Sequence, residues 1–129
     1  MDGFLKPSKP LHLERGKRSE AIAVQFLQSQ GYTVLAANVR YPFGELDIVA
    51  MEGDTLCFVE VRSTGSDAWG GPFTTITGKK KRCIIRAASA YLAALSKQPL
   101  FTRFDAIGVL WLDAGTPQIE LLRGAFDAC

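Results

Sequence analysis

The sequence contains one histidine, three cysteines and no Cys-x-x-Cys pair. The histidine, His12, stands in a basic segment, so we expect a surface residue and no histidine-based catalysis. An odd number of cysteines without paired spacing favours neither a disulfide framework nor a zinc site. Gly-rich phosphate loops and the Gly-x-Ser-x-Gly elbow of serine hydrolases are also missing.

Long apolar segments are missing as well. No uninterrupted apolar run approaches the roughly twenty residues that span a bilayer, and the N-terminal residues contain no apolar core of signal-peptide length. We therefore expect a cytoplasmic protein that does not enter a membrane. Low-complexity tracts and repeats are absent too, which argues against disorder and solenoids. The 129 residues predict one domain over 11–129, preceded by a flexible arm over 1–10.

Positive charge is unevenly distributed, although the net charge is only +2. Ten of the fifteen Lys and Arg residues fall in two short windows. The windows are Lys6, Lys9, Arg15, Lys17 and Arg18, and Lys79, Lys80, Lys81, Arg82 and Arg86. Such clusters are usually solvated faces, and only a position beside a reactive site would favour phosphate binding.

The stretch over 44–62 predicts a β-hairpin, because two runs rich in β-branched and large apolar residues flank a turn at Gly53 and Asp54. A two-residue loop there pairs Glu52 with Thr55, and this register determines the pairs farther from the turn. The expected pairs are Met51 with Leu56, Val49 with Phe58, Asp47 with Glu60, and Glu45 with Arg62. Side chains alternate along a strand, so all of these are expected on one face.

This register brings two carboxylates, those of Asp47 and Glu60, together inside an apolar patch. Directly opposed like charges destabilise a sheet unless something neutralises them. A divalent cation would do so, and Mg²⁺ suits such a pair because it binds few protein oxygens and keeps water or phosphate in its other positions. The alternative is that Asp47 lies at an exposed strand end, while Glu45 and Arg62 form an ordinary ion pair.

The first helix is predicted over 11–30, where an apolar stripe at helical spacing ends at Gly31. Glu20 lies at the margin of that stripe, so it is either a third carboxylate leaning toward the sheet or a solvated helical residue. Further strands are expected at 32–39, 104–112 and 118–122. The order is αβββαββ, an α/β fold with a mixed central sheet flanked by helices.

The second helix is expected to follow the aperiodic segment 63–77, whose length is typical of functional loops. Its first turn would contain Lys79, Lys80, Lys81 and Arg82. Cations there oppose the helix macrodipole, so local stability does not explain them, whereas an anion held by those side chains and by free amides would. The alternative is that the helix begins later and leaves the lysines in a solvated loop.

Several spaced motifs between about Gly16 and Phe126 occur together in this chain. They are Gly16-x-x-x-Glu20, Asn38-x-Arg40, Gly44-Glu45-Leu46-Asp47, Phe58-Val59-Glu60-Val61-Arg62, Lys80 and Ala88-x-x-Tyr91-Leu92. The combination resembles the YraN family, bacterial proteins with a restriction-endonuclease-like PD-(D/E)xK nuclease fold similar to archaeal Holliday junction resolvases.

The resemblance implies an endonuclease that uses Mg²⁺ or Mn²⁺ and acts on DNA rather than RNA, including branched DNA. Action on a junction would suggest a homodimer. The resemblance makes Asp47 and Glu60 the metal-ligand acids, adds the carbonyl of Val61 to the metal shell, and makes Glu20 the helical acid of related resolvases. Substrate binding is expected at Arg40, Lys79, Lys80, Lys81 and Arg82.

Arg62 departs from the family pattern, which has a catalytic lysine at this position. Lysine offers a titratable ammonium, whereas arginine is planar and always protonated, so Arg62 can stabilise charge but cannot act as a base. Either Lys80 or Lys81 reaches the site from the helix, as relocated lysines do in some members of this superfamily, or the protein is a catalytically impaired nucleic-acid-binding module. A third interpretation is a protein-interaction domain in which the acids merely pair with arginines.

Overall fold

The computed structural model describes residues 11–65, 76–111 and 115–128, with side chains from residue 16 onward. The expectations for the arm over 1–10, for the loop segment 66–75 and for the side chain of His12 lie outside this part. The elements are α1 (Leu11–Ser29), β1 (Thr33–Tyr41), β2 (Gly44–Glu52), β3 (Thr55–Thr64), α2 (Gly78–Ala93), β4 (Phe101–Leu110) and β5 (Gln118–Phe126). The predicted αβββαββ order is confirmed.

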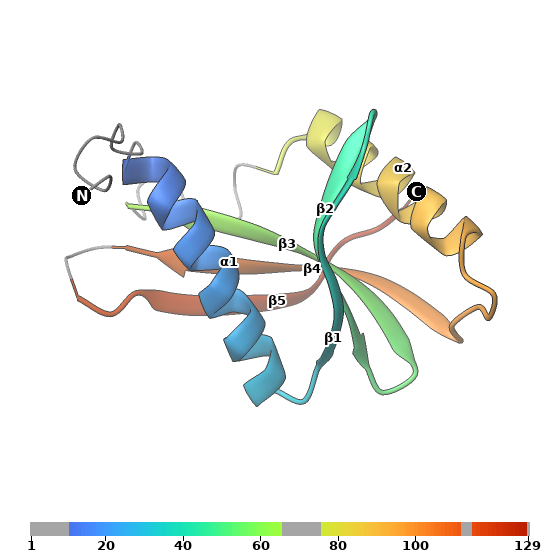
Figure 1. The fold of residues 1–129 in the computed structure, drawn as a ribbon, viewed down its shortest axis with the longest axis horizontal. Coiled ribbons are helices and arrows are strands. Elements are labelled where there is room, and N and C mark those ends of the chain that lie inside the picture. Colours follow the sequence, from blue (N-terminus) through green and yellow to red (C-terminus); the bar gives the residue numbers. More distant parts are fainter. Residues whose placement is uncertain (1–10, 66–75, 112–114, 129) are drawn as a thin grey trace, which may run out of the picture.

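The five strands form one mixed sheet in the order β1-β2-β3-β4-β5 (Figure 1). Neighbours are antiparallel except β3 and β4, which are parallel because the chain crosses over through α2 between them. β3 is the central strand, and β1 and β5 are the edge strands. The arrangement is an α/β fold consistent with the restriction-endonuclease-like class.

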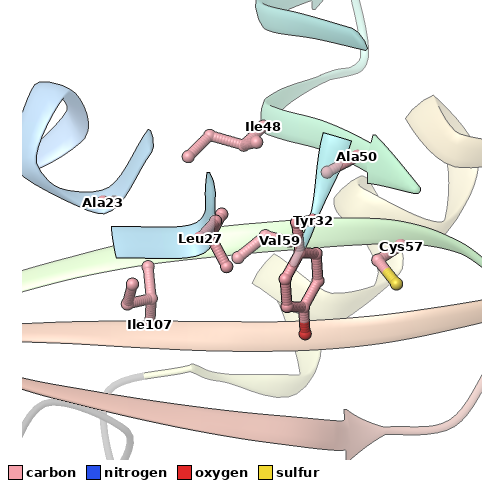
Figure 2. Packing of buried hydrophobic residues seen from close by; sticks show 8 residues of the cluster. All are labelled: Ala23, Leu27, Tyr32, Ile48, Ala50, Cys57, Val59 and Ile107. Atoms are coloured by element: carbon pink, nitrogen blue, oxygen red, sulfur yellow. The ribbon is translucent and has the colours of Figure 1, made fainter. Parts of the chain in front are cut away.

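Two apolar clusters cover the two faces of the sheet. The α1 cluster contains Ala23, Leu27, Tyr32, Ile48, Ala50, Cys57, Val59 and Ile107 (Figure 2). The α2 cluster contains Leu46, Val49, Leu56, Phe58, Ile84, Ala87, Ala88 and Phe104. Because β2 and β3 supply residues to both clusters, they are the buried middle of the molecule. Neither α1 nor α2 combines the length and apolar character that crossing a bilayer requires.

The hairpin between β2 and β3 has the predicted register near its turn. Glu52 pairs with Thr55, and the pairs Met51 with Leu56 and Val49 with Phe58 follow. Gly53 takes a positive φ of 61°, which glycine adopts without the steric cost of a side chain.

A buried ion network ties the hairpin to β4. The Asp105 carboxylate is fully buried and receives hydrogen bonds from the Arg103 Nε at 2.7 Å and the Tyr32 hydroxyl at 2.9 Å. Arg103 also donates to Glu52 at 2.7 Å, and Arg123 donates to the same carboxylate. The hydrogen bonds from these arginines lower the pKa of Glu52 to about 2, with that from Arg123 contributing most. This network is structural, since its buried charges are paired with one another.

Candidate active site

Strands β2 and β3 separate beside the start of α2, and we call this point the fork. The pairing of β2 with β3 ends at Ile48 and Val59. Beyond that point β2 stays paired with β1 as far as Gly44, whereas β3 continues beside β4 as far as Thr64. In Figure 1, β2 begins beside the start of α2, while the end of β3 continues beside β4. Backbone groups that would pair inside a continuous sheet are therefore available to side chains at the fork.

Asp47 bridges this fork. Its Oδ2 accepts a hydrogen bond from the backbone N–H of Val61 at 2.9 Å, which links β2 to β3 after their ladder has ended. Burial raises the pKa of Asp47 to about 7, helped by the negative charge of Glu60 and by a hydrogen bond between the two carboxyl groups. The predicted meeting of these two acids is confirmed, and burial together with their mutual repulsion favours the protonated form of Asp47.

Glu60 is the best-buried charge of the site, with 4% of the residue exposed. One of its oxygens, Oε1, lies 3.5 Å from the Lys80 Nζ and 3.7 Å from the Arg62 NH1. Arg62 shares the face of Glu60, as period-two alternation predicts. Lys80 comes from the other side of the fork, in the first turn of α2. The site therefore joins two acids to two cations drawn from three elements.

The first turn of α2 is capped, and this cap positions Lys80. Thr77 precedes the helix, and its Oγ1 accepts a hydrogen bond from the Lys80 backbone N–H at 3.2 Å. The helix begins at Gly78, so the alternative of a later start is wrong. Lys81 lies with its Nζ 5.6 Å from the centre of the Phe126 ring, away from the acids. Of the two lysines considered from the sequence, Lys80 is the one that reaches the site.

Gly44 sets the distance between the β1–β2 turn and α2. A Cβ atom at this position would lie 2.5 Å from the Cys83 carbonyl oxygen, a separation that folded proteins do not tolerate. Only glycine lets the turn lie directly on the helix. Because Lys80 is three residues before Cys83, this close approach also holds the first turn of α2 over the fork.

The predicted pair of Glu45 with Arg62 is wrong. Glu45 pairs instead with Arg40 across β1 and β2, with their charged groups 3.9 Å apart, and Arg62 approaches Glu60. The side-chain alternation of β2 is also interrupted at this end, since Leu46 packs in the same cluster as Val49 although the two are three residues apart. The reason is the divergence of the two strands, which ends the hairpin register before it reaches residues 45 and 62.

Glu20 leans toward the sheet, which was one of the two alternatives. Its carboxylate hydrogen-bonds Asn38, and its pKa is raised mainly by burial, with smaller contributions from the charges of Asp47 and Glu45. It lines a cavity of about 360 Å³ on the α1 side of β2. It does not join the two acids as a third ligand: the described residues hold no group of three or more His, Cys, Asp or Glu side chains that could hold a metal.

Asp47 and Glu60 fit a divalent cation by the chemistry of their donors. Carboxylate oxygens are the ligands that Mg²⁺ and Mn²⁺ prefer, and Mg²⁺ needs only one or two of them from protein. Burial, and after it the charge of Glu60, raise the pKa of Asp47 and so oppose its ionisation, and a bound cation would favour the charged carboxylate. The hydrogen bond from Val61 orients the Asp47 carboxylate, as outer-shell donors do around metal ligands. The role of the Val61 carbonyl stays a prediction.

A second cavity, of about 430 Å³, lies between the β1–β2 turn and α2. Its lining residues include Tyr41 and Phe43 together with Lys80. The two rings stack with centroids 5.4 Å apart and an interplanar angle of 6°. Sequence reasoning did not select these rings, although two aromatic residues beside Arg40 and just before Asp47 were a usable signal.

Comparisons with known proteins agree on one family. Residues 19–109 match the sequence model of Uncharacterised protein family UPF0102. A UPF0102 protein of Chlorobium chlorochromatii is 47% identical over 96 residues, which are 74% of each chain. One of Geotalea daltonii is 42% identical over 112 residues, covering 87% of this chain and 88% of the relative. One of Desulfosudis oleivorans is 41% identical over 113 residues, covering 88% and 89%.

Proposed function

Since the chain belongs to the UPF0102 family, the YraN family that its motifs resemble, we propose that it is a metal-dependent endonuclease that hydrolyses DNA phosphodiesters. The observation that carries this proposal is the Lys80 ammonium 3.5 Å from Glu60, beside a second acid, Asp47, whose pKa is raised to about 7. A perturbed acid with a specific charged neighbour is typical of catalytic sites.

Asp47 and Glu60 would hold Mg²⁺ or Mn²⁺, with the Val61 carbonyl as a further ligand. The bound ion supplies a Lewis acid that polarises the phosphate and lowers the pKa of the attacking water. Asp47 must lose its remaining proton to bind the ion, so binding is expected to release protons near pH 7 and to strengthen as the pH rises.

Lys80 takes the role that the family pattern gives to a lysine at the Arg62 position. Its flexible ammonium carries three donors that can hold the attacking water or a phosphate oxygen, whereas the Arg62 guanidinium is a planar group whose donors have a fixed geometry. Both side chains approach the same oxygen of Glu60, so both lie within reach of a phosphate bound at the acids. In this proposal Lys80 positions the nucleophile and Arg62 stabilises negative charge on the phosphate.

Phosphate binding extends from this centre over the exposed surface of α2. Lys79 and Arg82 are exposed in its first turns, where unpaired amides favour anions. Arg40, whose side chain is 77% exposed, extends the positive surface to the β1–β2 turn. Duplex or branched DNA would meet these cations before its backbone reaches the acids, and salt would weaken that attraction.

The second candidate function is a non-catalytic module that binds nucleic acid. What favours it is the double neutralisation of Glu60, because Lys80 and Arg62 compensate its charge without any metal ion. In that case the site would be an internal ion cluster, and added Mg²⁺ would have no effect on it.

A cleavage assay separates the two functions. End-labelled linear, flapped and four-way DNA is incubated with the protein and Mg²⁺ or Mn²⁺, under single-turnover conditions. We expect cleavage that Lys80→Ala reduces by about 100-fold or more, since misplacing a reacting group by about 1 Å can cost that much. Arg62→Lys should change the rate by less than about tenfold. Lys97→Ala, an exposed lysine after α2, is the matched control and should cleave like the parent.

The result that would overturn the proposal is absence of metal-dependent cleavage on all three substrates by folded protein. Cleavage that survives Lys80→Ala but rises with Arg62→Lys would retain an endonuclease and contradict the role given to Lys80.

A further inference from the structure

The cavity between the β1–β2 turn and α2 shares one side chain with the acid pair. Lys80 lines this cavity of about 430 Å³ and also lies 3.5 Å from Glu60. A phosphate held at the acids by Lys80 would therefore have the cavity directly beside it. The group that occupies the cavity is then expected to be the sugar and base of the nucleotide joined to the scissile phosphate.

The lining of this cavity has the chemistry of a nucleobase site. One wall is aromatic, with Tyr41 stacked on Phe43, and the Arg86 guanidinium lies 4.6 Å from the centre of the Phe43 ring. Flat rings offer stacking to any base, and each stacked base is worth on the order of a tenfold gain in affinity or more. The remaining walls include apolar Ile84 and, at the rim, Arg40.

The polar groups of the rim supply both kinds of hydrogen-bonding partner. Arg40 carries donors and Glu45 carries acceptors, and the two lie 3.9 Å apart beside the aromatic wall. Base edges present donors and acceptors side by side, so this pair suits them better than it suits a lipid or a simple anion. The turn that carries these groups cannot drift from the helix, because Gly44 lies directly against the Cys83 carbonyl.

The size of the cavity suits one unpaired base. A volume of about 430 Å³ is in the range of small-ligand pockets, which matches a single nucleoside. A base inside a duplex would have to be extruded first, at a cost of unstacking and unpairing that is smallest for single-stranded or mismatched positions. The cavity is therefore expected to bind a nucleotide that is already unpaired more tightly than one in a duplex.

We propose that this cavity binds one unpaired nucleobase next to the scissile phosphate, which makes single-stranded or flapped DNA the preferred substrate class. The inference rests on the proposed endonuclease function for its position, since the acids locate the phosphate. Its binding step needs no cleavage, however, and it is testable without a metal ion.

The first test places the change in the DNA. Binding of the full chain to a 12-nucleotide single strand is measured in EDTA by fluorescence anisotropy, beside the same strand annealed to its complement. In a flapped duplex, an abasic site is then moved one position at a time through the unpaired arm and across the junction. We expect one position at which loss of the base weakens binding by roughly tenfold. A uniform effect of the abasic site at every position would overturn the proposal.

The second test places the change in the protein. Tyr41→Leu removes the ring and keeps apolar volume, and Tyr41→Phe is the matched control that keeps the ring. We expect the leucine variant to lose roughly tenfold in affinity for the single strand and to bind the duplex as before, while the phenylalanine variant binds both like the parent. Equal affinity of all three proteins for single strand would overturn the inference. Preference for unpaired DNA without cleavage by any protein would support the base site and contradict the endonuclease.

Discussion

The Asp47 carboxylate should lower the stability of the folded protein at neutral and alkaline pH. In the folded state burial and the charge of Glu60 raise its pKa from 3.8 to about 7. At roughly 1.4 kcal/mol for each pH unit, that rise corresponds to about 4 kcal/mol as an upper bound. Asp47→Asn removes the charge and keeps the shape, and its amide oxygen can still accept the hydrogen bond from Val61.

The sign of the effect follows from proton binding. Between pH 3.8 and about 7 the folded state keeps a proton on Asp47 that the unfolded chain has lost. Stability contributed by this group is therefore lost as the pH rises through that window. The asparagine variant has no such loss. We expect it to be more stable than the parent by about 1 to 4 kcal/mol at pH 8, with the difference vanishing near pH 3.5.

Urea unfolding of both proteins from pH 3.5 to pH 8 measures this difference. Asp54→Asn, at the exposed hairpin turn, is the matched control for removing one carboxylate from the surface. Added Mg²⁺ should then recover stability for the parent, by about 1.4 kcal/mol at ten times its dissociation constant, and by no more than about 0.4 kcal/mol for Asp47→Asn. A variant that is less stable than the parent at pH 8 would refute the reasoning, since Asp47 would then be a stabilising charge.

Three further predictions concern the fold and the positive surface. Asp105→Ala should destabilise the protein by about 3 kcal/mol in urea unfolding, because it strips the ion network of a fully buried acid; a loss below about 1 kcal/mol would contradict that role. Gly44→Ala should displace the turn from the Cys83 carbonyl and lower cleavage by about 100-fold, and unchanged cleavage would show that the turn can shift freely. Replacing Lys79 and Arg82 by alanine should flatten the log-log dependence of duplex affinity on salt by roughly 0.9 for each DNA phosphate that the variant no longer neutralises, and an identical slope would place both on a solvated face.

The sequence predicts those parts of the fold that depend on local geometry. The turn at Gly53 determines the pairs nearest to it. The parallel pairing of β3 with β4 follows from the handedness of a helical crossover. These rules act over a few residues or over one connection, so a single sequence is enough to apply them.

The open end of the hairpin was predicted wrongly because distant strands control it. β2 follows β1 and β3 follows β4, so the fork depends on partners that the hairpin register does not contain. Glu45 consequently pairs with Arg40, a residue that precedes the hairpin. The approach of Asp47 to Glu60 was still predicted correctly, because both residues lie within one position of the last regular pair.

The sequence could not show which of the two adjacent lysines reaches the acids. Lys80 and Lys81 are adjacent in sequence, and only the packing of α2 shows that one approaches Glu60 while the other lies over Phe126. The aromatic cavity depends on the close approach of Gly44 to α2, which no spacing in the sequence reveals. Non-local packing therefore determines which lysine approaches the acids and where the cavity forms, although the two acids were predicted from the sequence.

Calorimetry of Mn²⁺ binding tests the central claim, a metal site at Asp47 and Glu60, most directly. The ion is titrated into the protein at pH 7 in two buffers of different ionisation enthalpy, which reports the protons released on binding. With the pKa of Asp47 near 7, we predict a site that releases about half a proton at pH 7 and almost none at pH 8.5, and that Asp47→Asn weakens by about tenfold or more. Binding of equal strength to the parent and to Asp47→Asn, without proton release, would contradict the account.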